Sequence, residues 1–138
     1  MHCNKGEYDL SSEKFRISYL KHESIHFTDL NDYPNLSSAD LEYRAKVVEL
    51  MYCTKTSIYE IINDFIHGSD STNRTHSHPY ANYSIIKKLS LLVFNLEHEI
   101  DLNKWQEISL EMINQAALEL YKTSEMILQK DTAISKII

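Results

Sequence analysis

The feature that most constrains this chain is His22-Glu23-Ser24-Ile25-His26, two histidines four residues apart with a glutamate after the first. On a helix, residues i and i+4 lie on one face with Cβ atoms about 5–6 Å apart, so both imidazoles can reach one metal ion. Glu23 lies about 100° further around the helix. Its side chain is long enough to reach a metal-bound water and accept a proton as general base. The segment therefore predicts a helix that carries two zinc ligands and one general base.

The composition favours helices over sheets. The chain has 138 residues, the size of one domain, and only two glycines and two prolines. So few glycines disfavour the tight turns that join β-strands, whereas long helices with short connections need few of them. We expect a mainly α fold over residues 1–138, a single metal-binding domain of four helices with little or no β-sheet.

Charge and hydropathy narrow the range of partners and locations that we expect for the chain. The formal net charge of −6 gives no basic footprint, so nucleic acid is disfavoured as a partner. No apolar run reaches the roughly 18–20 residues of a membrane span, and the first residues lack the apolar region of a signal peptide. Cys3 and Cys53 form no C-x-x-C pair or disulfide framework. We expect a reduced, cytoplasmic protein, and the oligomeric state stays open.

The apolar periodicity predicts where the four helices lie. Ser11 or Ser12 can cap the first helix, Pro34 marks the turn after it, and Ser37 or Ser38 can cap the second. The second helix can kink near residues 54–56, and residues 122–138 have the pattern of a fraying tail whose isoleucines pack locally or on a partner. The expected helices cover residues 12–30, 38–68, 80–98 and 103–130.

A third metal ligand is expected on the second helix. A short turn between the first two helices predicts an αα-hairpin, in which His26 lies about one turn before the bend and Glu42 about one turn after it. Glu42 is therefore the expected ligand, with Glu49 as the alternative two turns further on and plain surface glutamates as the other interpretation. Asp29, three residues after His26, needs a partner because an acid opposes the dipole at a helix end. It could support a ligand histidine or stay solvated.

The polar segment 68–79 is the other concentration of catalytic residue types. It holds Arg74, His76 and His78, and Tyr80 and Tyr83 follow on the next helix. A hydrolase needs a donor aimed at the oxyanion, and His78 and Tyr80 are the candidates. Because His76 and His78 alternate along an extended segment, only one of them would face the site. The alternative is an exposed loop with two solvated histidines.

Taken together, His22-Glu23-x-x-His26 and Glu42-x-x-Ala45 resemble the gluzincin branch of zinc metallopeptidases. The resemblance covers about residues 12–50. It implies a Zn²⁺ ion on His22, His26 and Glu42, with Glu23 as general base and a peptide or protein as substrate. His26-x-x-Asp29 is similar to an extension found in some gluzincins, in which the acid supports a ligand. The residues ahead of the first helix leave room for one strand at most, so we expect a minimal, helical version.

Two other functional classes remain open. Arg16 and His22 have the R-x5-H spacing of the RNase motif in HEPN helical domains, although Ile17 replaces the usual polar residue. The second class is a helical bundle with a structural or interaction role, in which the metal motif is accidental. Metal content separates them, because only a zinc site should respond to a chelator.

Overall fold

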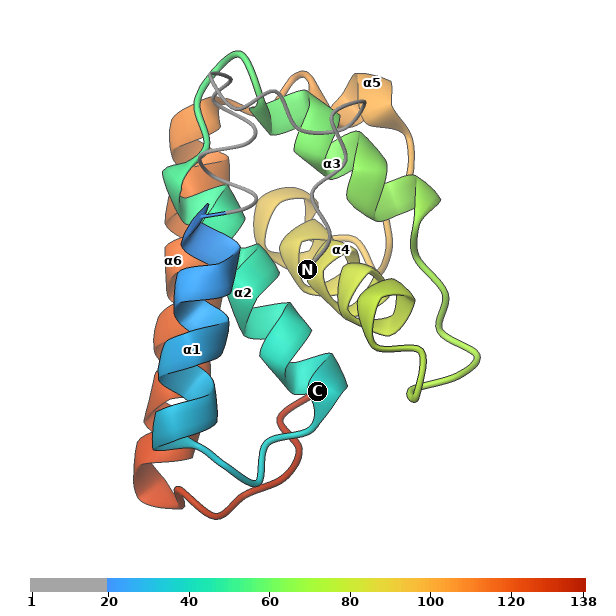
Figure 1. Ribbon diagram of the computed structural model, residues 1–138. Coiled ribbons are helices and arrows are strands. Elements are labelled where there is room, and N and C mark those ends of the chain that lie inside the picture. The colour runs from blue at the N-terminus through green and yellow to red at the C-terminus, as the bar shows by residue number, and fades with distance from the viewer. Residues whose placement is uncertain (1–19) are drawn as a thin grey trace.

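The computed structural model describes residues 20–138, and within them the chain is helical, with no β-strand (Figure 1). The mainly α prediction is confirmed for this part of the chain. The expected caps Ser11 and Ser12 and the start of the first predicted helix lie outside the described residues. The helices are α1 (His22–Asp32), α2 (Ser38–Tyr52), α3 (Ile58–His67), α4 (Ser77–Phe94), α5 (Leu102–Trp105) and α6 (Leu110–Lys130).

The prediction of four helices is wrong, because two of the expected helices are interrupted. Residues 53–57 separate α2 from α3, and Cys53 has the extended backbone that ends α2. Residues 106–109 separate α5 from α6, where the Ser109 side chain caps α6 by accepting a hydrogen bond from the Met112 N–H. The sequence places small hydroxyl residues at both breaks, and the breaks let the chain turn where a continuous helix would leave the core.

Helix α2 lies at the centre of the arrangement and contacts α1, α4 and α6 (Figure 1). Its Ser37 cap accepts from the Asp40 N–H, as the sequence predicts. Tyr43, Val47 and Leu50 of α2 join the apolar core, which α3, α4, Trp105 and α6 complete. The rest of the buried surface of α2 is unusually polar and includes Asp40, Arg44 and Glu49.

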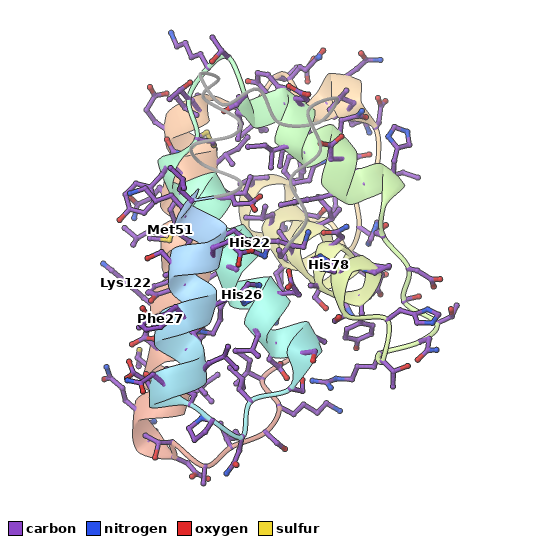
Figure 2. All side chains as sticks on the ribbon, in the orientation of Figure 1. His22, His26, Phe27, Met51, His78 and Lys122 are labelled. Carbon is purple, nitrogen blue, oxygen red and sulfur yellow. The ribbon has the colours of Figure 1, made fainter. Side chains whose placement is uncertain are left out.

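Helix α1 has its polar side inward. Its buried residues are His22 and Asp29, whereas Phe27 and Leu30 are 79% and 58% exposed. In Figure 2, His22 and His26 lie on the side of α1 that faces α2 and α4, and Phe27 lies on the opposite side. Because apolar burial does not explain this orientation, polar contacts must determine how α1 docks.

The C-terminal segment packs against the start of α2. The carboxylate oxygen Oδ1 of Asp40 accepts from the N–H groups of Ile137 and Ile138 at 2.8 and 2.9 Å. Both isoleucines contact the apolar core. The expected fraying from residue 122 is wrong, since α6 continues to Lys130; the expected local packing of the terminal isoleucines is confirmed. No helix among residues 20–138 combines the length and the apolar character needed to cross a bilayer.

Candidate metal centre

The α1–α2 hairpin brings two histidines and one glutamate to a single point. Nε2 of His22 and Nε2 of His26 lie 2.8 Å apart, and they lie 2.9 and 2.7 Å from the two carboxylate oxygens of Glu42. One ligand atom from each residue can be chosen so that all three lie within 4.8 Å of one another. The bend at residues 33–37 is short enough to bring Glu42 level with His26, as the hairpin argument predicts.

Glu49 contacts the second ring nitrogen of His22, Nδ1. Its Oε1 lies 2.8 Å from Nδ1 of His22, and both side chains are buried. A carboxylate on the far nitrogen of a ligand histidine fixes the ring orientation and leaves Nε2 to face the metal. Glu49 is therefore placed as a support for His22, a role that the sequence interpretation did not consider. Its signal was present, because Glu42 and Glu49 are seven residues apart and share one helix face.

The charges of the centre are strongly coupled. Burial alone would lower the pKa of His22, but the carboxylates of Glu42 and Glu49 outweigh it and raise this pKa to about 9. Burial pushes the pKa of Glu42 upward, and contacts with His22 and His26 reverse this, so that it falls well below its usual range. Burial raises the pKa of Glu49, which His22 and the charge of Lys46 only partly oppose. In the absence of a metal, a proton on His22 holds the two carboxylates together.

His78 is the residue of the 68–79 segment that reaches this centre. It lies in the first turn of α4 (Figure 2). Its Nδ1 is 3.2 Å from Oε2 of Glu42. Burial, and the neighbouring charge of Lys46, lower the pKa of His78, although Glu42 opposes them. His76, at the N-cap of α4, is exposed. The expectation that one of the two histidines faces the site is met by His78.

The segment before His78 is held to α2 by a buried acid. Nη2 of Arg74 donates to Oδ2 of Asp40 at 2.7 Å, and its Nε donates to the carbonyl of Ile138. Asp70 and Asn73 each accept bonds from a threonine two residues further on, which forms two tight local turns. The start of α4 is thereby fixed against the end of α2 that carries Glu42.

The other two expected catalytic residues lie differently. Glu23 is half-buried on α1 beside His22, and within residues 20–138 no hydrogen bond or ion pair joins its carboxylate to the ligand residues. Tyr80 lies two residues beyond His78, on another face of α4. There it faces the Arg74 guanidinium and the Tyr83 ring, and it lines a cavity of about 500 Å³ with Lys87. The described contacts of Tyr80 do not reach the histidines.

Both interpretations of Asp29 are wrong. It neither supports a histidine nor stays solvated, but is 1% exposed and bonded to Arg44. Nε and Nη2 of Arg44 donate to its two oxygens at 2.8 and 3.1 Å. The guanidinium also donates hydrogen bonds to three side chains of α6. We call this group the Arg44 cluster; it consists of Asp29, Arg44, Tyr121, Ser124 and Glu125.

The donor set of the centre fits a zinc ion. Two imidazole nitrogens and a carboxylate are ligands that zinc accepts, and bonds of about 2.0–2.1 Å put tetrahedral ligands about 3.3 Å apart. The observed separations of 2.7–2.9 Å need to widen only slightly. Oε2 of Glu42 is also buried, and although Nε2 of His22 lies 2.9 Å away, no hydrogen bond of good geometry reaches it. Coordination to a metal would satisfy its lone pairs. We call His22, His26, Glu42, Glu49 and His78 the histidine cluster.

Comparison of the chain with protein-family models, curated proteins and solved structures found no match. The gluzincin resemblance therefore remains an interpretation of the motif. Of the two residues behind the RNase alternative, Arg16 lies outside the described residues. His22 is 3% exposed and meets Glu49 and Glu42 at its two nitrogens, so it offers no free nitrogen to a nucleic-acid backbone.

Proposed function

We propose that this protein is a zinc-dependent hydrolase of the peptidase type, with its metal held by His22, His26 and Glu42. The observation that carries the proposal is the convergence of two Nε2 atoms on a carboxylate whose Oε2 is buried without a hydrogen bond of good geometry. Glu49 supports it further, because its contact with Nδ1 leaves Nε2 of His22 for the metal.

The division of labour follows from the chemistry of each group. Zinc, when bound, would lower the pKa of a water molecule to about 7 and polarise a substrate carbonyl. Glu23 would take the proton from this water and pass it to the leaving amine, a role that suits a half-buried carboxylate next to a ligand. Of the two predicted oxyanion donors, His78 has the better position, since it contacts Glu42 while Tyr80 faces Arg74.

The substrate-binding mode is expected to differ from that of sheet-containing peptidases. Residues 20–138 contain no strand whose edge could align an extended peptide. The substrate would have to approach over the start of α4, where His78 is the exposed member of the cluster. A short peptide or a single exposed amide bond fits this approach better than a long extended chain.

Metal content by mass spectrometry tests the metal site. We expect about one zinc per chain in the freshly purified protein and a sharp fall in Glu42→Ala, because the carboxylate bridges both histidines. Glu119→Ala, which removes an exposed glutamate of α6, is the matched control and should keep its zinc. Wild-type protein that takes up no zinc on reconstitution would overturn the proposal and favour the interaction bundle.

Turnover requires a separate variant. Glu23→Gln should keep the zinc and lose hydrolysis in a screen of short peptides, because the amide cannot accept the proton. His22→Ala and His26→Ala should lose both. Full activity in Glu23→Gln would show that another group acts as the base.

A further inference from the structure

We propose that His78 is a fourth protein ligand of the zinc site. Its imidazole would close the site at rest and be displaced when substrate binds, which frees it to act as the oxyanion donor. The inference rests on the proposed function, since it needs a metal on His22, His26 and Glu42. It adds a specific role for α4, namely that this helix supplies a ligand to a centre otherwise built by α1 and α2.

The distances around Glu42 support this role. Nδ1 of His78 is 3.2 Å from Oε2 of Glu42, close to the separation of about 3.3 Å between neighbouring ligands of a tetrahedral zinc. Yet this oxygen makes no well-formed hydrogen bond, so His78 approaches it without the alignment of a donor. The His78 ring is nearly parallel to that of His22, at 9° with centroids 6.3 Å apart. Among residues 20–138, only His22, His26 and Glu42 have ligand atoms that all lie within 4.8 Å of one another, so coordination by His78 requires its exposed side chain to turn toward the ion.

Exposure distinguishes His78 from the other ligands. Its side chain is 59% exposed, against 4% for His22, 18% for His26 and 12% for Glu42. A ligand that is half in solvent loses little burial when it swings away from the metal. Displacement of His78 would therefore leave the solvent side of a bound zinc open to a substrate carbonyl or an attacking water.

The backbone of His78 need not move in this exchange. Arg74, four residues earlier, is bonded to the fully buried Asp40, two residues before Glu42 on α2. Pro79 fixes the backbone directly after His78, and its carbonyl accepts from the Asp70 N–H at 3.0 Å. Side-chain rotation alone would thus carry the imidazole away from a bound metal and back, while the start of α4 stays in place.

Cobalt substitution tests the coordination directly. The visible absorption of Co²⁺ reports its coordination number and the identity of its ligands. It can be read on wild type, on His78→Ala and on the control His76→Ala, which removes an exposed histidine two residues away. We expect a four-coordinate spectrum in wild type and His76→Ala and a changed spectrum in His78→Ala, where water replaces the imidazole. Zinc affinity should fall at least about tenfold in His78→Ala alone. Added azide should bind His78→Ala more tightly than wild type, because no ligand has to be displaced.

The outcomes separate the two proposals. Wild-type spectra and zinc affinity in His78→Ala would overturn the fourth ligand and leave the three-ligand site intact. No cobalt or zinc uptake by wild type would overturn both. His78→Gln, with far-ultraviolet circular dichroism as a check of folding, repeats the test with a polar side chain of similar reach. It should behave as His78→Ala does.

Discussion

Two polar clusters are centred on the α1–α2 interface, and the residues that α1 and α2 contribute to them are largely buried. The two clusters differ in the source of their positive charge. The Arg44 cluster contains its own cation: the guanidinium is 1% exposed and donates to Asp29, Ser124, Tyr121 and Glu125. The histidine cluster consists of two carboxylates and three imidazoles, and its two Nε2 atoms point at each other. The Arg44 cluster has a permanent cation that folds with the chain, whereas the histidine cluster has only the proton that its acids hold on His22.

The two clusters follow each other closely in sequence, which makes the contrast informative. Asp29 is three residues after His26, and Arg44 is two residues after Glu42, so each helix contributes to both. Lys46 is a cation near the histidine cluster, but its ammonium lies over the Phe65 ring. Burying carboxylates without a paired cation is expensive. The difference indicates that the Arg44 cluster fixes the register of α1 on α2; under the proposed function, the histidine cluster would receive a metal cation from solution.

The largest effect is expected where the built-in cation is removed. Arg44→Met leaves Asp29 buried without a partner, and breaking a buried pair in this way costs about 3–5 kcal/mol of unfolding free energy. Denaturant unfolding in the presence of a chelator measures it. His26→Ala, under the same conditions, should lose much less unfolding free energy, because without metal His26 has no buried charge of its own to satisfy.

An exposed cation gives the control for this comparison. Lys122→Met, on the outer face of α6, should change the unfolding free energy by less than about 0.5 kcal/mol. If Arg44→Met were no worse than Lys122→Met, the Arg44 cluster would not hold the two helices in register.

A smaller effect is expected from the support of His22. Glu49→Gln removes a charge but can keep the contact with Nδ1, so the ring orientation survives while the basicity of Nε2 falls. Loss of such a partner typically weakens metal affinity about 10–100-fold. Competition with a zinc-binding dye measures the affinity. Glu119→Gln, an exposed glutamate of α6, should leave the affinity unchanged, and an unchanged affinity in Glu49→Gln would remove Glu49 from the site.

Local rules predicted the residues whose partners are close in sequence. The spacing of His22 and His26 and the short bend at residues 33–37 were enough to bring Glu42 to the histidines, and Ser37 caps α2 as expected. Helix periodicity and a turn of known length determine these contacts. They require no knowledge of how the rest of the chain packs.

Partners that lie far apart in sequence could not be predicted in this way. The sequence pairs Asp29 with a histidine or with solvent, because contact with its actual partner, Arg44, depends on how closely α1 packs on α2. Arg44 in turn is fixed by Ser124, 80 residues further along the chain. The break at residues 106–109 has a similar origin, since it lets α6 run back along α2 (Figure 1). Tertiary packing, not propensity, decides such features.

The smallest expected effect is the pH dependence of stability. A proton can supply the positive charge of the histidine cluster, but it cannot take the place of the Arg44 guanidinium. In the metal-free protein the pKa of His22 is raised from 6.5 to about 9, so the folded state binds this proton more tightly than the unfolded state. The resulting stabilisation is complete below about pH 6.5 and is lost as the pH rises through about 9. One proton limits the slope to about 1.4 kcal/mol per pH unit. Arg44 makes no contribution to this pH dependence. Although burial opposes the shift, its neighbours Asp29 and Glu125 raise its pKa further above the pH range of the experiment.

Unfolding free energies at pH 6.5, 7.5 and 8.5 in a chelator measure this slope, with His22→Gln as the matched variant. Stability should fall with pH in wild type and stay nearly level in His22→Gln, which has no proton to lose at this position. Saturating zinc should also level the wild-type profile, because the metal takes the place of the proton on Nε2. Equal slopes in both proteins would mean that another group titrates, and that His22 does not hold the two carboxylates together.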